Sequence, residues 1–172
     1  MWNFGRADSI EPEAIGEPGD RRFRIRVMAQ LESASLWLEK EQVAALALAL
    51  RRLLEQTKPA EEPVEPEPVM GASFPEMPDV DFRPSRLGIG HDEQATSISI
   101  FAYDPDAAED ENASPTFSCQ VSRGQARAFA QRAEEIVNAG RPVCVLCGLP
   151  IDETGHKCLR RNGHAGPSAS VG

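Results

Sequence analysis

Residues 22–56 read RFRIRVMAQLESASLWLEKEQVAALALALRRLLEQ, and the hydrophobic period changes along this stretch. Apolar and polar residues alternate over residues 22–30, which is typical of a strand with one buried face. A second alternating run covers residues 34–39. Over residues 40–56 the apolar residues recur every three or four positions, as in an amphipathic helix. The stretch therefore predicts two strands followed by a helix that packs on them.

The second half of the chain has the same organisation. Residues 82–90, 96–103 and 115–122 read as strands, and residues 124–138 read as a helix that stops before a glycine and a proline. A shift of 83 residues superimposes the two helices without a gap and also aligns the strands before them, and its aligned pairs include Gln42 with Gln125, Val43 with Ala126, Leu46 with Phe129, Ala47 with Ala130, Leu53 with Ile136 and Leu36 with Cys119. We therefore predict a duplicated β-β-α unit.

These patterns predict an α+β fold with one antiparallel sheet of about five or six strands and both helices on one face. The two β-β-α units are expected at residues 12–57 and 82–140. Residues 58–81, between the units, are rich in Pro and Glu and lack a usable period, which predicts a semi-extended linker. Residues 1–11 show no periodicity either.

Most of the metal-coordinating side chains lie near the C-terminus, where residues 144–164 read CVLCGLPIDETGHKCLRRNGH. The segment opens with a C-x-x-C pair, Cys144 and Cys147, and Cys158 follows at the distance expected in a zinc ribbon. The usual position of the last ligand in such a module is occupied here by Arg161. A histidine must therefore complete the set.

Two histidines could supply the fourth ligand. We favour His156, because residues two apart on an extended strand face the same side and His156 lies two before Cys158. His164, beyond an Asn-Gly turn, is the alternative. Either set surrounds a zinc ion with four protein ligands and leaves no position for water, so we expect a structural zinc in a knuckle at residues 141–164. Residues 165–172 are expected to form a disordered tail.

The C-x-x-C pair has a second interpretation, as a redox pair or as thiols without a metal. A redox pair is expected at the start of a helix that follows a strand. Pro142 before the pair and Gly148-Leu149-Pro150 after it disfavour a helix there. Metal binding is therefore the favoured interpretation.

The overall charge narrows the function classes. The formal net charge is −9 and the isoelectric point is about 4.9, so the field of the protein would repel nucleic acid and anionic membranes. The N-terminus has no apolar stretch of signal-peptide length, and the longest apolar run is too short to span a membrane. We therefore expect a cytoplasmic protein with reduced cysteines.

Three side chains on one strand face could contact an anion. Arg22, Arg24 and Arg26 alternate with apolar residues and could hold a phosphate or an acidic partner. The alternative is a solvated face, or cross-strand pairing with carboxylates. Cys119 is predicted to be a buried small hydrophobic residue, and nothing in the sequence brings His91 near it. A Cys-His active site is therefore not expected.

Four motifs together resemble an actinobacterial domain-of-unknown-function family of similar length. They are the GEPG turn at residues 16–19, LEKEQV at 38–43, FRPSRLGIG at 82–90 and the C-terminal CVLCGLPID and GHKC pattern. The resemblance covers residues 15–164, and the C-terminal motif is its most specific part. It implies no established activity. It implies a possible shared pathway with two protein partners, one similar to a histidine phosphatase and one similar to a phosphatidylinositol kinase.

Two function classes follow from these observations. The favoured one is a non-catalytic zinc-binding adaptor whose protein partner meets the exposed sheet face or the basic residues Lys157, Arg160 and Arg161. The alternative is an enzyme or binding protein for a phosphorylated small molecule, held where the arginine row converges with His91 or a carboxylate in a concave pocket. A nucleic-acid role is a third and weaker hypothesis, because the zinc module lacks interleaved aromatic residues.

Overall fold

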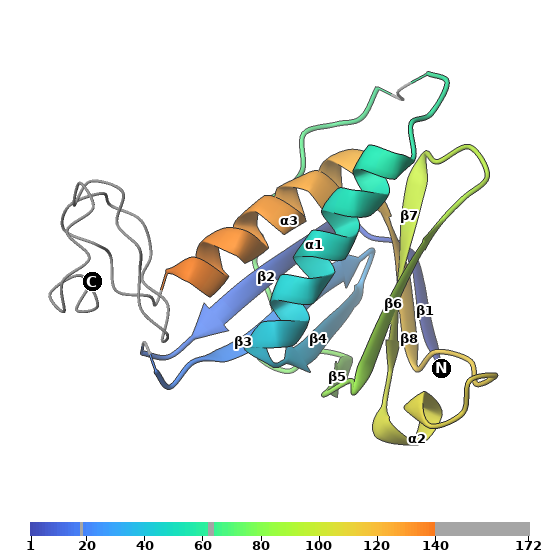
Figure 1. The fold of residues 1–172 in the computed structure, drawn as a ribbon. Coiled ribbons are helices and arrows are strands. Elements are labelled where there is room, and N and C mark those ends of the chain that lie inside the picture. The colour runs from blue at the N-terminus through green and yellow to red at the C-terminus, as the bar shows by residue number, and fades with distance from the viewer. Residues whose placement is uncertain (18, 62–63, 140–172) are drawn as a thin grey trace, which may run out of the picture.

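The computed structural model describes residues 1–17, 19–61 and 64–139 of the 172-residue chain. Figure 1 shows the arrangement of its helices and strands. No helix in the described ranges is long and apolar enough to cross a membrane. The elements are β1 (Trp2–Arg6), β2 (Ser9–Ile15), β3 (Arg22–Ala29), β4 (Glu32–Leu38), α1 (Lys40–Gln56), β5 (Val80–Phe82), β6 (Arg86–His91), β7 (Ser97–Tyr103), α2 (Pro105–Ala108), β8 (Phe117–Ser122) and α3 (Arg123–Asn138).

The strands form two four-stranded sheets of the same design. Sheet A has the order β1-β8-β7-β6 and sheet B has the order β2-β3-β4-β5. In each sheet three consecutive strands form an antiparallel meander, and a long helix follows the last of them. The fourth strand pairs in parallel with that last strand, β1 with β8 and β5 with β4. Each sheet is therefore mixed.

The α+β class is confirmed, and both long helices lie where their apolar periods predict them. The structure differs from the prediction in having two sheets in place of one. Residues 82–90, predicted as one strand, are divided between β5 and β6 by residues 83–85, which include Pro84. Proline lacks the N–H that a continuous ladder needs. The chain therefore passes from sheet B to sheet A at this point.

The strands β1 and β2 lie mostly in the segment without periodicity. β2 contains Pro12 and runs along the edge of sheet B, the position in a sheet where proline is tolerated. β1 includes Gly5 at φ +62° and a shift in its pairing register with β8. These irregularities hide both strands from a search for alternating residues.

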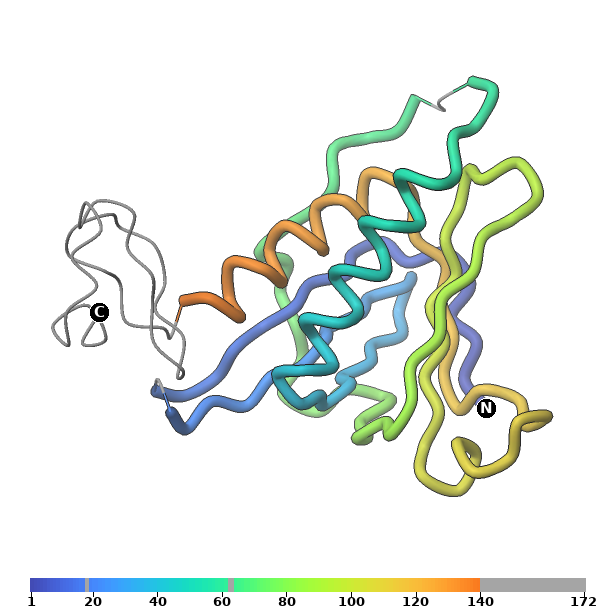
Figure 2. Tube along the Cα trace, viewed as in Figure 1, coloured from blue at the N-terminus to red at the C-terminus, as the bar shows by residue number. Residues whose placement is uncertain are grey.

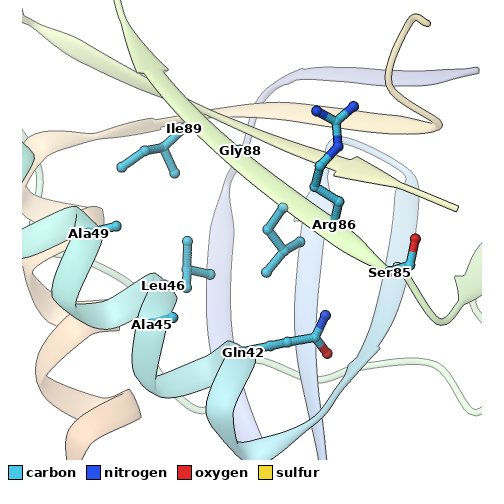
Figure 3. Close-up of a pocket in the computed structure, with 9 residues that line it drawn as sticks. Gln42, Ala45, Leu46, Ala49, Ser85, Arg86, Gly88 and Ile89 are labelled. Carbon is cyan, nitrogen blue, oxygen red and sulfur yellow. The ribbon is translucent and has the colours of Figure 1, made fainter. Parts of the chain in front are cut away.

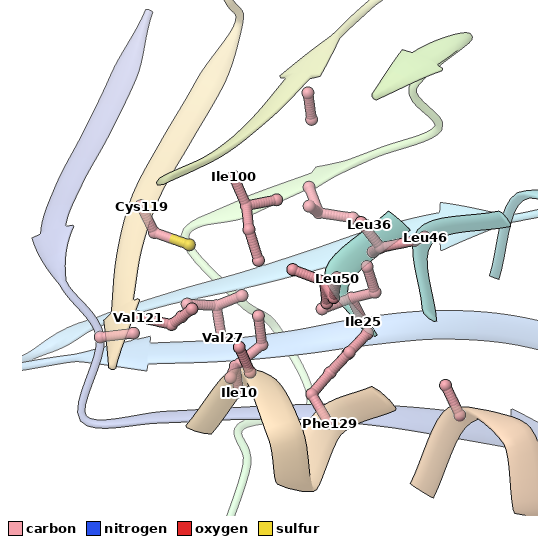
Figure 4. Packing of buried hydrophobic residues seen from close by; sticks show 14 of the residues in the cluster. Ile10, Ile25, Val27, Leu36, Leu46, Leu50, Ile100, Cys119, Val121 and Phe129 are labelled. Atoms are coloured by element: carbon pink, nitrogen blue, oxygen red, sulfur yellow. The ribbon is translucent and has the colours of Figure 1, made fainter. Parts of the chain in front are cut away.

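One hydrophobic core joins both sheets and both long helices. The helices α1 and α3 pack against each other, α3 also packs on β2, and α1 contacts β6 of the other sheet. Figure 4 shows Cys119 and Ile100 of sheet A beside Val27 of sheet B. Burial of each large apolar side chain contributes about 1.5–3 kcal/mol before conformational entropy is subtracted.

The segment between α1 and β5 is attached to the rest of the protein at several places. It leaves the end of α1, passes the start of α3 and returns to sheet B (Figure 2). The amide of Gly124 donates to Glu65 Oε2 at 3.1 Å, and the amide of Ala72 donates to Glu11 Oε1 at 3.3 Å. The Ser33 amide donates to Asp79 Oδ2 at 2.8 Å. The predicted linker therefore makes specific contacts with both halves.

Candidate functional site

The predicted metal ligands lie outside the described residues. This applies to Cys144, Cys147, His156, Cys158 and the alternative His164, and equally to the basic residues Lys157, Arg160 and Arg161. Within residues 1–17, 19–61 and 64–139, no three His, Cys, Asp or Glu side chains are grouped so that they could hold a metal ion. The zinc site therefore stays a prediction.

The arginine row of β3 is paired with carboxylates of β2. The antiparallel register places Arg24 opposite Glu13 and Arg26 opposite Glu11. Arg24 Nε donates to Glu13 Oε2 at 2.5 Å, and Arg26 Nη2 donates to Glu11 Oε2. Glu11 is only 6% exposed, so removal of Arg26 would leave a buried carboxylate without its ion-pair partner. The structure thus contains the cross-strand pairing that was the alternative to an anion site.

Aromatic rings cover the same arginines. The Arg22 guanidinium lies 4.1 Å from the centre of the Trp37 ring. The guanidinium groups of Arg24 and Arg26 lie 5.1 and 5.7 Å from the centre of the Phe74 ring, which belongs to the segment between α1 and β5. Cation–π contacts of this kind hold a guanidinium against a face. A phosphate would have to displace Glu11 and Glu13 to use this row.

A polar hollow of about 990 Å³ opens where β2 faces α3. Its described lining combines Arg26 and Glu11 with residues of α3 and of the segment after α1, among them Ala128, Arg132, Glu135, Met70 and Gly71. His91 is not part of it, and its Nδ1 lies 2.7 Å from the carbonyl oxygen of its neighbour Asp92. The structure therefore brings Arg26 together with carboxylates but not with His91.

Cys119 is buried, as predicted, with 1% of its surface exposed. Its strand lies between β1 and β7, and it faces Ile100 across the β7–β8 pair. Desolvation by burial raises the pKa of the thiol to about 12. A thiol with that pKa stays protonated near neutral pH and is a poor nucleophile.

A second hollow is apolar and lies between α1 and β6 (Figure 3). It measures about 370 Å³ and is lined by Gln42, Ala45, Leu46 and Ala49 of α1, and by Ser85, Arg86, Leu87, Gly88 and Ile89 in and just before β6. We call it the α1–β6 groove. Gln42 Nε2 donates to the Pro84 carbonyl at 3.3 Å and closes one end. Sequence reasoning missed this groove because it depends on which helix meets which sheet.

The strand β6 is the edge of sheet A beside this groove. None of its six residues is fully buried, whereas the first four residues of β2 are. β6 pairs with β7 along one side, and among the described residues no backbone hydrogen bond joins its other side to another segment. Its middle residues are Leu87, Gly88, Ile89 and Gly90. These four residues carry no charge, and an edge strand whose middle residues are uncharged can accept another strand.

The two hollows occupy corresponding places in the two halves. Moving 83 residues along the chain takes Ala45 of the groove to Ala128 of the polar hollow, and Ala49 to Arg132. In the polar hollow the chain's own Met70 and Gly71 lie beside β2. The α1–β6 groove has no described segment of this kind in its lining.

Comparison with known proteins identifies one family. A family model described as "Protein of unknown function (DUF3090)" matches residues 2–158. No curated protein and no solved structure matches the chain. The matched span contains both meanders, both long helices and the positions of the C-x-x-C pair.

Proposed function

Since the chain belongs to the DUF3090 family of proteins of unknown function, we propose its function from its own residues: a non-catalytic, zinc-binding protein that acts as an adaptor between proteins. Its protein partner binds at the α1–β6 groove by adding an extended strand to β6. The observation that carries this proposal is the free edge of β6 next to an apolar groove.

Strand addition suits this surface for two physical reasons. The unpaired amides and carbonyls of an edge strand supply main-chain hydrogen bonds, and a neighbouring pocket receives alternate side chains of the added strand. Leu46, Leu87 and Ile89 give the groove an apolar lining. Met70 and Gly71 line the corresponding hollow, so a peptide segment is accommodated beside the first strand of the other meander.

The partner expected here is an extended protein segment with apolar side chains at alternate positions. The sequence-based hypothesis placed the partner on the exposed sheet face with the arginine row. Phe74 and Trp37 cover those arginines, so the groove in sheet A is the better surface. Partners similar to a histidine phosphatase or a phosphatidylinositol kinase are implied by the family resemblance alone.

The test compares two neighbouring alanines of α1, because both are exposed and only Ala45 lines the groove. An Ala45→Arg substitution puts a charged side chain into the groove, and Ala44→Arg puts the same side chain beside it. We expect the first variant to lose its co-purifying partner by about tenfold or more and the second to retain it. Equal recovery by both variants, or a protein that purifies alone as a monomer, would contradict the proposal.

Zinc is the proposed structural ion of the C-terminal segment. Cys144, Cys147, His156 and Cys158 would supply two thiolates, an imidazole and a third thiolate, a set that fills a tetrahedral site. The family match ends at Cys158, so it includes these four positions and leaves His164 beyond it. That boundary supports His156 as the fourth ligand.

Metal analysis of the purified protein tests this ligand set. We expect about one zinc ion per chain, lost in Cys147→Ser and in His156→Ala and retained in His164→Ala. The two histidine variants are matched, because each removes one imidazole from the same segment. Loss of zinc in His164→Ala with retention in His156→Ala would reverse the assignment, and a metal-free wild-type protein would reject it.

The proposal of a phosphorylated ligand at Arg22, Arg24 and Arg26 is less well supported. Glu13 and Glu11 neutralise two of the three guanidinium groups.

A further inference from the structure

The two crossings of the chain between the sheets are built alike. Between β1 and β2 the chain passes from sheet A to sheet B, and Gln125 Nε2 donates to the Ala7 carbonyl there at 3.0 Å. Between β5 and β6 it passes back, and Gln42 Nε2 donates to the Pro84 carbonyl at 3.3 Å. Each glutamine belongs to the capping box of a long helix. The two halves therefore correspond in these contacts as well as in their strand orders.

The backbone at the start of each meander shows the same correspondence. Just before β2, the Asp8 amide donates to the Met28 carbonyl at 2.7 Å. Just before β6, the Ser85 amide donates to the Tyr103 carbonyl at 2.9 Å. Both strands then run along the edge of their sheet. β6 therefore has the place in sheet A that β2 has in sheet B.

The segment after α1 enters the polar hollow beside β2. Met70, fourteen residues beyond the end of α1, lines that hollow together with Gly71. The Ala72 amide donates to Glu11 Oε1 at 3.3 Å. Among the described strands β2 pairs only with β3, so this segment lines the hollow without adding a strand to the edge.

The counterpart of this segment in the second half is the chain that follows α3, which lies outside the described residues. It contains an uncharged apolar run, Leu149-Pro150-Ile151, which we call the LPI run. Ile151 is thirteen residues beyond the end of α3, whereas Met70 is fourteen residues beyond the end of α1. The LPI run therefore has about as much chain to reach the α1–β6 groove as Met70 has to reach the polar hollow.

An uncharged occupant suits the α1–β6 groove better than it suits the polar hollow. The third and fifth residues of β2 are Glu11 and Glu13, whereas those of β6 are Gly88 and Gly90. α3 also packs more extensively on β2 than α1 packs on β6, and the apolar residues of β6 are only partly buried. Apolar side chains placed in the groove would remove this surface from water.

From this correspondence we propose that the LPI run occupies the α1–β6 groove in the free protein and that a protein partner must displace it. The second part concerns regulation of the groove and rests on the proposed function. A segment that closes a binding surface lowers the apparent affinity for the partner, because only the molecules with an open surface bind. The outer edge of β6 stays unpaired while the LPI run is in place, as the edge of β2 does beside Met70.

Nuclear magnetic resonance of the full chain, without a partner, tests the contact from the side of the LPI run. Ile151→Asp puts a charge on the run, and we expect amide shift changes at residues 42–49 and 85–89. Val171→Asp makes the same kind of change near the end of the chain and should leave those amides unchanged. Changes from Ile151→Asp that stay within residues 140–172, or that appear at the polar hollow instead, would overturn the proposal.

A substitution in the groove tests the same contact from the other side. Ala45→Arg obstructs the groove, and we expect it to change the amide shifts of residues 149–151. Ala44→Arg is the control, because Ala44 is also exposed but does not line the groove. Equal effects of both arginines would contradict the contact. Shift changes that grow with protein concentration would mean that the LPI run of a second copy enters the groove, which would also overturn it.

Recovery of the co-purifying partner tests the regulatory part. We expect Ile151→Asp to recover about threefold more partner than the wild-type protein does. Unchanged recovery, in a protein that shows the reciprocal shifts, would reject the regulatory part and leave the contact supported. Reciprocal shifts in a protein that recovers no partner would instead overturn the proposed function, so the two failures can be told apart.

Discussion

Ion pairs at alternating positions join β2 and β3 on one face of sheet B. Arg24 and Arg26 face Glu13 and Glu11 across two antiparallel strands. The arginine face could be predicted from the alternation of β3, and pairing with carboxylates was one of its two interpretations. The carboxylates could not be identified from the sequence, because Glu11 and Glu13 flank Pro12 at the end of a segment without periodicity and no strand was predicted there.

Removal of one carboxylate from these ion pairs is expected to lower the free energy of unfolding. In Glu11→Gln the Arg26 guanidinium loses its hydrogen-bonded carboxylate in a buried setting and keeps only Glu13, whose Oε2 lies 3.8 Å from its Nε, so we expect a loss of about 3 kcal/mol in the free energy of unfolding. The control is Glu13→Gln, because the Glu13 side chain is 31% exposed and its pair is partly screened. We expect about 1 kcal/mol or less there. Chemical denaturation measures both values, and equal losses would contradict the account of Glu11 as the buried partner.

At the scale of elements, the periodicity of apolar residues predicts the long helices and the strands that have one buried face. The apolar stripes of α1 and α3 and the alternation of β3, β7 and β8 are visible in short windows of sequence. The edge strands β1 and β5 are not, because each is short and gains its place from parallel pairing with a strand far away in the chain. The side chains of β1 and β5 therefore do not predict these strands unless the partner strand is already known.

The edge strand β1 nevertheless contributes to the core. Phe4 is 8% exposed, and its ring meets that of Phe117 edge-on at 4.9 Å between centres. We expect Phe4→Ala to lower the free energy of unfolding by about 3 kcal/mol, as other buried Phe-to-Ala changes do. Trp2→Ala is the control on the same strand, since Trp2 is 43% exposed, and we expect a smaller loss. Thermal or chemical denaturation would measure both variants, and no loss in Phe4→Ala would mean that β1 is not docked.

At the scale of the whole molecule, two meanders of the same design share one core and exchange helices. α3 packs on β2 of the other half, and α1 contacts β6 of the other half. This exchange creates the two hollows at corresponding places. The duplication inferred from the 83-residue shift agrees with the equal strand orders and stays a prediction. The division into two sheets could not be predicted. The alternation of apolar and polar residues along a strand indicates which face is buried, but it does not indicate which strands pair.

The same arrangement places β6 at an edge of sheet A, next to the α1–β6 groove. Met70 and Gly71 of the segment after α1 line the polar hollow beside β2, whereas the described lining of the α1–β6 groove includes no residue of such a segment. The proposed adaptor role depends on this difference between the halves. It requires a partner that completes sheet A at β6.

Amide hydrogen exchange of the protein, alone and with its co-purified partner, tests this requirement most directly. The amides of Arg86–His91 that do not pair with β7 should exchange rapidly in the free protein and become protected in the complex, with Ala45 and Ala49 of α1 shielded beside them. Protection that appears on the outer face of sheet B, with β6 exchanging as fast as before, would contradict the account.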